Sequence, residues 1–268
     1  MTAARKNLLA AGDPAPVTIY NAAGPSPFLL VADHAGNLIP RALGDLGVSA
    51  AERERHIGWD IGIADVGRLL ADALDATLIA QNYSRLVIDC NRAPGMPTSI
   101  PEVSELTAVP GNVGLAEADR AARVLDIFWP YHARIDAELT RRRRDGRPTA
   151  LIALHSFTPS FKGTARPWHV ALLYNRDPRL ARRLMAVFAE EPGLVVGDNE
   201  PYFVSDATDY TIPAHGERYG LLHALIEIRQ DLIADPKGQR AWADRLARVL
   251  PAASGAFMPL WQPARPGG

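Results

Sequence analysis

The sequence is nearly free of cysteine, because its 268 residues include only one, Cys90. A single thiol cannot form an intramolecular disulfide, which excludes a disulfide-built framework and favours a reducing compartment. Because Cys90 closes a short apolar run, we interpret it as a packing residue and not as a nucleophile.

Long apolar runs and an excess of charge of one sign are also missing. Nowhere do about 18 apolar residues follow one another, and residues 1–16 lack the continuous apolar core of a signal peptide. We therefore expect a soluble, cytoplasmic protein without a membrane partner. The 29 Lys and Arg residues nearly balance the 30 Asp and Glu residues, for a formal net charge of -1 at pH 7. No broad basic surface is expected for nucleic acid.

Three widespread motifs are absent as well. The sequence has no Gly-x-Gly-x-x-Gly after a strand, no phosphate loop that ends in Gly-Lys-Ser/Thr, and no Gly-x-Ser-x-Gly turn. These absences argue against a nucleotide-binding domain and against a serine hydrolase.

Short apolar runs alternate with helical patterns along the chain. We expect strands at 27–33, 76–80, 86–90, 150–154, 170–174, 194–196 and 221–229, and helices at 61–74, 115–143, 178–189 and 237–250. This alternation predicts a mostly parallel sheet that helices cover on both sides. Hydrophobic residues make up 47% of the chain, enough for one large core. We expect a single α/β domain over residues 1–268, with a loose N-terminus at 1–16.

Two of the predicted strands end in a histidine. His34 follows the strand at 27–33, and His155 follows the strand at 150–154. In open α/β sheets, ligands bind beyond the carboxyl ends of the strands. Each histidine alone fits a structural role, but two in equivalent places favour a shared set of ligands, and neutral imidazole is a good zinc donor.

A catalytic zinc ion usually takes three protein ligands, so a carboxylate is expected beside the two histidines. Asp60 precedes the helix predicted at 61–74. There it fits either the third ligand or the cap of that helix. The sequence leaves both roles open.

Period-2 alternation in the strand at 221–229 places Glu227 and Arg229 on the same face as His223 and Leu225. Charged side chains in such an apolar strand are rarely buried unless they are paired. Glu227 therefore fits either an ion pair, with Arg229 or a more distant cation, or a general base beside activated water.

The segment 83–92 contains two arginines, Arg85 and Arg92, with Asp89 and Asn91 between them. A planar guanidinium group matches the geometry of a carboxylate, so these arginines suit a substrate with a free acid group. Structural salt bridges are the alternative for either arginine.

Together these residues resemble a known family. The matching pieces are Asp33-His34-Ala35-Gly36-Asn37 with Ile39-Pro40, Asp60, Ser84-Arg85-Leu86-Val87-Ile88-Asp89-Cys90-Asn91-Arg92, His155-Ser156 and Ile226-Glu227-Ile228. They occur in the order seen in N-formylglutamate amidohydrolases. The resemblance spans residues 27–231, and the block at 84–92 is its most specific part.

The resemblance implies a three-layer domain similar to zinc carboxypeptidases, with a mixed, mainly parallel sheet between helices. It implies one zinc ion, or another divalent ion such as cobalt, held by His34, Asp60 and His155. It also implies Glu227 as the general acid/base and Arg85 as a stabiliser of oxyanion charge. Asn91 and Arg92 are then the residues that bind the α-carboxylate of the substrate.

The sequence departs from typical deformylases in two places. Asp33 precedes His34, where those enzymes have proline, and the segment 229–232 resembles a side branch of the family. These departures concern the substrate more than the chemistry, and we include Arg229 among the substrate-binding residues. Asn37 lies three residues after His34, the spacing at which carboxypeptidases place a metal-binding glutamate, so Asn37 is the reserve third ligand.

We therefore expect a zinc-dependent hydrolase that cleaves the amide bond of an N-acyl amino acid, with N-formyl-L-glutamate, an intermediate of histidine degradation, as the first substrate. One alternative is another N-acyl amino acid or a short peptide. The other is a non-catalytic binder of acidic metabolites, in which Asp60 caps a helix and Glu227 belongs to an ion pair.

Overall fold

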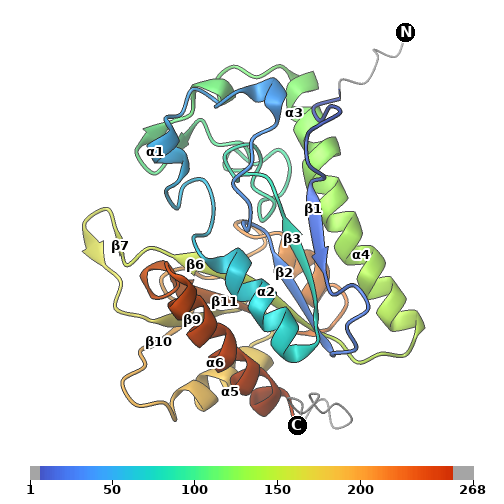
Figure 1. Ribbon diagram of the computed structural model, residues 1–268, viewed down its shortest axis with the longest axis vertical. Helices are drawn as coiled ribbons and strands as arrows, with labels where there is room; N and C mark the ends of the chain where they lie inside the picture. Colours follow the sequence, from blue (N-terminus) through green and yellow to red (C-terminus); the bar gives the residue numbers. More distant parts are fainter. Residues whose placement is uncertain (1–6, 256–268) are drawn as a thin grey trace.

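A seven-stranded sheet with helices on both sides forms the centre of the protein (Figure 1). The computed structural model describes residues 7–255. In spatial order the strands are β1 (Val17–Tyr20), β3 (Thr77–Gln81), β2 (Phe28–Ala32), β6 (Ala150–Phe157), β11 (Leu222–Arg229), β9 (Val170–Leu173) and β10 (Val196–Asp198). The predicted three-layer α/β class is confirmed.

The four central strands β3, β2, β6 and β11 run parallel to one another. Antiparallel pairs lie to either side of them, because β1 runs antiparallel to β3, and β9 runs antiparallel to β11. The sheet is therefore mixed and mostly parallel, as predicted. Its parallel centre brings the carboxyl ends of β2, β6 and β11 to one edge of the sheet, where sites form in such folds.

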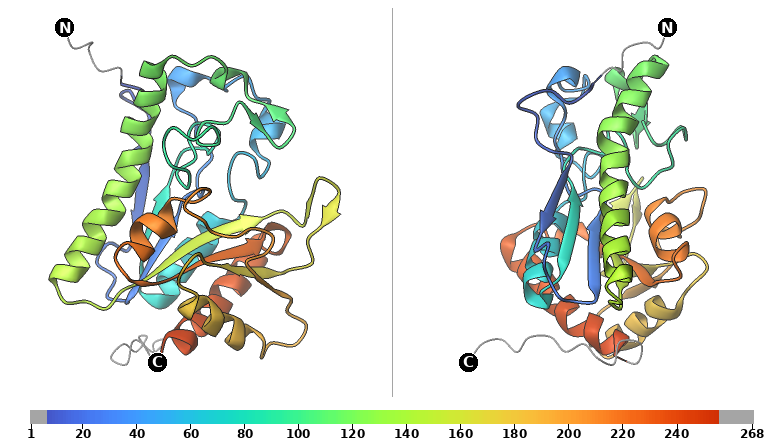
Figure 2. Two further views of the ribbon diagram at one scale, coloured as in Figure 1. Left: turned by 180° about the vertical axis from the view of Figure 1, so that it is seen from behind. Right: turned by 90° about the vertical axis from the view of Figure 1, so that its right-hand side faces the viewer.

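Helices α2 (Ile63–Leu74), α5 (Arg179–Phe188) and α6 (Pro236–Ser254) cover one face of the sheet. On α2, Val66, Leu70 and Leu74 recur at four-residue spacing, so one stripe of the helix packs on the apolar residues of the strands. The opposite face is covered by α4 (Trp129–Arg144), so that the sheet lies between two helical layers (Figure 2).

One long helix was expected at 115–143, and the structure divides it. Helix α3 (Glu117–Arg123) continues through a π-helical turn, Val124–Phe128, into α4. Pro130 lies two residues after this turn, and it has no N–H group to donate to an α-helical hydrogen bond. A π turn accommodates such an interruption without ending the helix.

Residues 86–90 do not form the predicted strand. They lie in an irregular segment with turns, although Leu86, Val87 and Ile88 are fully buried among the side chains that pack under α3 and α4. A short apolar run shows that a segment is buried, but not that it is extended. The strand expected at 194–196 also lies later, at Val196–Asp198.

The N-terminal part was predicted to be loose over residues 1–16, and residues 1–6 lie outside the described residues. Leu8 is buried, and its backbone N–H donates to Asp126 over 2.6 Å. The Tyr83 hydroxyl donates to the carbonyl of Pro14. The described part of this segment therefore packs on the rest of the protein before the edge strand β1, which the sequence did not predict.

Short elements occupy the long connections. They are α1 (Ala50–Arg53), the hairpins β4 (Val103–Ser104) with β5 (Thr107–Ala108) and β7 (Ser160–Phe161) with β8 (Thr164–Ala165), a π-helical segment Ile212–Glu217, and 3₁₀ turns at Arg41–Leu43, Pro110–Asn112 and Gln230–Leu232. Within residues 7–255, no helix is long and apolar enough to cross a membrane.

Candidate active site

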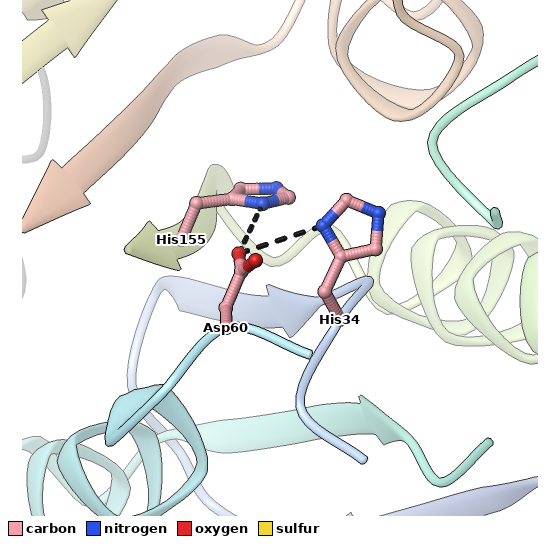
Figure 3. A group of neighbouring side chains, drawn as sticks. All are labelled: His34, Asp60 and His155. Carbon is pink, nitrogen blue, oxygen red and sulfur yellow. Dashed lines mark hydrogen bonds and ion pairs between the residues drawn. The ribbon is translucent and has the colours of Figure 1, made fainter. Parts of the chain in front are cut away.

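Three buried side chains from separate parts of the chain meet at the carboxyl edge of the sheet. His34 lies two residues after β2, Asp60 in the loop before α2, and His155 within β6, which runs three residues further than predicted. One nitrogen of each histidine and one oxygen of Asp60 lie within 4.8 Å of one another (Figure 3). We call these three residues the convergent cluster.

The two imidazole rings present the same nitrogen to Asp60. Its Oδ2 lies 2.9 Å from Nδ1 of His155 and 3.4 Å from Nδ1 of His34. The other ring nitrogen of each histidine contacts a second carboxylate. Nε2 of His34 lies 2.7 Å from Asp89, and Nε2 of His155 lies 3.0 Å from Asp33. Carboxylates in this position fix the tautomer and orientation of metal-binding histidines.

The convergent cluster fits a divalent metal ion. Nδ1 of His34 is buried and makes no hydrogen bond within residues 7–255, although it faces the carboxylate of Asp60. Two imidazole nitrogens and one carboxylate oxygen are a donor set that zinc takes in catalytic sites. The orphaned nitrogen and the anchored rings therefore both favour an ion between these three groups.

Asp60 does not cap helix α2, because the residue at the cap position is Gly62 and no side chain caps this end. The carboxylate instead accepts from the backbone N–H of Ser156 in addition to its contacts with the two histidines. Asn37, the reserve ligand, donates to Glu54 and is not part of the cavity lining. Of the two candidates, the geometry favours Asp60.

The carboxylates control the charge of this cluster. Burial opposes ionisation of Asp33, but hydrogen bonding to His155 and nearby positive charge lower its pKa to about 2. Burial likewise lowers the pKa of His155, but the hydrogen bonds to Asp33 and Asp60 outweigh it and raise that pKa well above its ordinary value. The site is thus built from ionised carboxylates that favour a cation between them.

Glu227 lies next to the convergent cluster because strand register places it there. It is the partner of His155 in the parallel pairing of β11 with β6. It is 8% exposed, its Oε2 has no hydrogen-bond partner, and burial raises the pKa of its carboxyl group to about 7. No ion pair of Glu227 is found within residues 7–255, so the ion-pair interpretation is not supported.

Arg85 borders the same space. Its Nε and Nη2 atoms donate to Oδ2 of Asp89 over 3.1 and 2.7 Å, and its Nη1 lies 3.5 Å from Asp60. Burial opposes its charge, but the two carboxylates raise its pKa further above its ordinary value. Asp89 therefore fixes both Arg85 and His34.

A cavity of about 330 Å³ opens over these groups. This volume is at the lower end for sites of small molecules. Arg92 and Asn91 line it, and Arg92 lies 3.8 Å from Asp209. The amide of Asn91 is engaged, because it donates to Asp209 and accepts from the backbone N–H groups of Tyr210 and Thr211.

Arg229 is not brought to the cavity. Its guanidinium group binds Asp231 over 2.8 Å and approaches the carbonyl groups of residues 166–168. The predicted period-2 alternation of β11 is confirmed, since Ala224, Ile226 and Ile228 pack on the opposite face of the sheet. Arg229, however, is the last residue of β11, and its side chain binds the carboxylate of Asp231 and does not line the cavity.

Several residues around the cavity were not predicted from the sequence. Asp33 and Asp89 stood out only as neighbours of His34 and of the arginines, and nothing marked Thr211, which donates to Asp33 over 2.7 Å. Ser156 stood out only as the neighbour of His155. Sequence reasoning missed the remaining lining residues His56, Phe157, Thr158, Leu173, Pro201, Tyr202, Phe203, Thr208, Asp209 and Leu225. Most of them lie in loops without a motif.

A second group of buried histidines lies elsewhere, and we call it the linear cluster: His132, His215 and Asp136. Nε2 of His132 lies 2.8 Å from the carbonyl oxygen of Cys90, and its Nδ1 lies 2.8 Å from Nε2 of His215. Nδ1 of His215 lies 3.1 Å from Asp136. Every ring nitrogen in this cluster therefore has a hydrogen-bond partner.

Comparison with known proteins agrees with this geometry. The sequence profile of a family described as N-formylglutamate amidohydrolase matches residues 26–234. This chain belongs to that family. Members of the N-formylglutamate amidohydrolase family are hydrolases that act on amide C–N bonds, and the resemblance stated from the sequence is confirmed.

Individual proteins that are similar to this chain support its assignment to the family. An N-formylglutamate deformylase of Pseudomonas putida is 30% identical over 187 residues, which cover 63% of this chain and 68% of the relative. The crystal structure of gene product Atu2144 from Agrobacterium tumefaciens is 38% identical, with a TM-score of 0.90 over 94% of this chain and 99% of that one. An N-formylglutamate amidohydrolase from Ralstonia eutropha shares the fold, with a TM-score of 0.66 and 21% identity over 92% of this chain and all of that one, 100%.

Proposed function

We propose that this protein is a zinc-dependent amidohydrolase that cleaves the amide bond of an N-acyl amino acid, with N-formyl-L-glutamate, which yields formate and glutamate, as the reference substrate. The observation that carries the proposal is the meeting of His34, Asp60 and His155 beside Glu227 in one cavity. The substrate is taken from the family, since the Pseudomonas putida relative is named as an N-formylglutamate deformylase.

His34, Asp60 and His155 are the residues that would hold the metal ion. A bound zinc ion supplies Lewis-acid chemistry, which polarises a carbonyl group and makes water a stronger nucleophile near neutral pH. Asp33 and Asp89 keep the two imidazole rings turned toward the ion. Zinc is proposed from this donor set, and cobalt would suit the same ligands.

Glu227 is the proposed general base and acid. Its carboxyl group is buried at the cavity, with one oxygen free of hydrogen bonds and a pKa raised to about 7. A group with a pKa near the working pH can accept the proton of the attacking water and return it to the nitrogen of the leaving amine. Both transfers occur at the same carboxylate oxygen.

Two arginines bind the negatively charged groups of the substrate. Arg85 keeps Nη1 at the cavity while Asp89 holds its other donors, so it can stabilise negative charge that develops on the carbonyl oxygen. One such donor contributes about 3 kcal/mol to the transition state. Arg92 binds the α-carboxylate of the substrate. Asn91 supports this contact by holding Asp209 and the backbone of the neighbouring loop.

The test is direct. The purified protein should contain about one zinc ion and release formate from N-formyl-L-glutamate. The Glu227→Gln variant should keep the metal and lose roughly 100- to 10,000-fold in kcat, the range for a general base. Full activity of this variant would remove Glu227 from the mechanism. A protein that binds no divalent metal and releases no formate from any N-formyl amino acid would end the proposal.

A further inference from the structure

The cavity has an apolar half that the proposed chemistry does not use. Its apolar lining residues are Phe157, Leu173, Pro201, Tyr202, Phe203 and Leu225. Phe157, Leu173 and Leu225 are each 2% exposed, so this wall is packed from behind by the protein. A substrate group that reaches this wall leaves water for an apolar surface.

The floor of the apolar half is fixed by the sheet. Leu225 lies two residues before Glu227 on the same face of β11, and its partner across the antiparallel pairing with β9 is Leu173. Two residues of a strand span about 7 Å. The side chain of an amino acid whose amide lies at Glu227 can therefore reach this pair of leucines.

The other side of the apolar half is the segment Pro201–Phe203. The ring of Tyr202 lies against the guanidinium group of Arg166, with 4.8 Å from Cζ to the ring centroid, so a buried partner holds this ring in place. Phe203 is 65% exposed even though it lines the cavity. Large exposed aromatic side chains at a cavity are typical of binding surfaces.

Among residues 7–255, few cations of the lining are available to bind a second carboxylate of the substrate. Arg85 is held by Asp89 and Asp60, and it is the arginine proposed above to stabilise the carbonyl oxygen. His56 lies 3.5 Å from Glu105, and burial lowers its pKa, which disfavours its charged form. Outside the convergent cluster, Arg92 is then the one lining cation within residues 7–255 that is left to bind a substrate carboxylate.

Negative groups of the lining also disfavour a second carboxylate. A second carboxylate on the substrate would have to share the cavity with Glu227 and Asp209, and Asp209 already lies 3.8 Å from Arg92. Like charges at such distances raise the free energy of a bound anion. Arg166 does not bind this second carboxylate, because it stacks on Phe161 and Tyr202 and does not line the cavity.

We propose that this site prefers an N-formyl amino acid with one carboxylate and an apolar side chain, such as leucine or phenylalanine, over the dicarboxylate N-formyl-L-glutamate. The proposal rests on the proposed function and specifies the side chain that the same site accepts. Arg92 binds the α-carboxylate, and the side chain lies between Leu225 and Phe203.

The experiment compares kcat/KM of the zinc-loaded protein for N-formylglycine, N-formyl-L-leucine, N-formyl-L-phenylalanine and N-formyl-L-glutamate. The leucine and phenylalanine substrates should exceed N-formylglycine at least tenfold, since even one buried methylene group is worth roughly ten- to 200-fold. N-formyl-L-glutamate should not exceed N-formylglycine. A higher value for glutamate than for leucine overturns the preference but leaves the proposed function intact. If none of the four is hydrolysed, both proposals fail.

Two variants at the exposed Phe203 separate an apolar subsite from a general effect. Phe203→Ala should lower the ratio of kcat/KM for N-formyl-L-leucine over N-formylglycine about tenfold, and Phe203→Arg should shift the preference toward N-formyl-L-glutamate. The control is Tyr20→Ala, because Tyr20 is a half-exposed aromatic residue on the edge strand β1, away from the cavity lining. Equal ratios in all three variants and the parent would overturn the assignment of the subsite.

Discussion

The two groups of histidine and aspartate, the convergent and the linear cluster, use the same residue types in different ways. In the linear cluster, the ring nitrogens of His132 and His215 all take part in a chain of hydrogen bonds. This chain ends at Asp136 and at the Cys90 carbonyl. In the convergent cluster, the Nδ1 atoms of His34 and His155 face a common space, and one of them has no hydrogen bond.

This difference separates a structural role from a ligand role. A metal ion needs donor atoms that converge and have no partner outside the set of ligands, whereas a structural histidine satisfies its nitrogens with other groups. The carboxylates behind His34 and His155 leave only the inward nitrogens available, and the linear cluster has no such arrangement. Composition alone would not distinguish the two groups.

The largest expected effect tests this comparison with one histidine from each cluster. His34→Ala should remove zinc from the purified protein and lower kcat at least about a thousandfold, since a catalytic metal supplies several kcal/mol. His132→Gln should keep about one zinc ion per chain. Stoichiometric zinc in His34→Ala, measured by elemental analysis, would contradict the ligand assignment.

Metal removal should destabilise the fold through the convergent cluster alone. Zinc at a free concentration 100 times its Kd should raise the free energy of unfolding of the metal-free protein by about 2.7 kcal/mol. The gain should persist in His132→Gln and vanish in His34→Ala. Denaturant unfolding at increasing zinc concentrations measures it, and an equal gain in both variants would place the ion elsewhere.

Asp89→Asn tests the carboxylate behind His34. Loss of such a partner typically weakens metal binding ten- to 100-fold, because the imidazole ring is less firmly oriented. The matched control is Asp136→Asn in the linear cluster, which should leave zinc affinity unchanged. Competition with a chelator measures the affinity for zinc. Equal affinities for Asp89→Asn and the parent would show that Asp89 positions Arg85 but does not position His34 for metal binding.

The smallest effect concerns pH and the linear cluster. Burial, with the neighbouring His215, lowers the pKa of His132 to about 3 from 6.5. Between these values the unfolded chain binds a proton that the folded chain does not, so stability falls as the pH drops below 6.5 and the loss ends near pH 3. From pH 7 to pH 5 this residue should cost about 2 kcal/mol of unfolding free energy.

The check is urea unfolding of the parent and of His132→Gln at pH 7 and pH 5. The glutamine variant cannot titrate at this position, so its loss of stability between the two pH values should be about 2 kcal/mol smaller. The same loss in both proteins would mean that His132 accepts a proton in the folded state.

The central strands could be predicted because each is buried on both faces and reads as one apolar run. The same signal gave a wrong strand at 86–90, where the apolar side chains pack under a helix without extended backbone. The direction of β9 could not be predicted, since it depends on the path of the connection and not on the residues of the strand.

The site could be predicted in part. The rule that ligands bind beyond strand ends, with the family resemblance, indicated His34 and His155, but only the structure showed that Asp60 does not cap α2 and lies beside the histidines. Asn91 could not be placed, because its partners lie at Asp209, Tyr210 and Thr211, more than 100 residues later in the chain. Arg229 could not be placed either, because alternation describes a strand and not the side chain at its last residue.

The π-helical turn at Val124–Phe128 sets two orientations within one helix. It takes one residue more than an α-helical turn, so everything after it is rotated by about 100°. Before it, Arg123 donates to Asn112 and to the carbonyl of Val87, in the loop that leads to the site. After it, Tyr131 and Ile135 pack on the sheet. Deleting one residue here would restore regular winding and turn one of these two halves away from its partners.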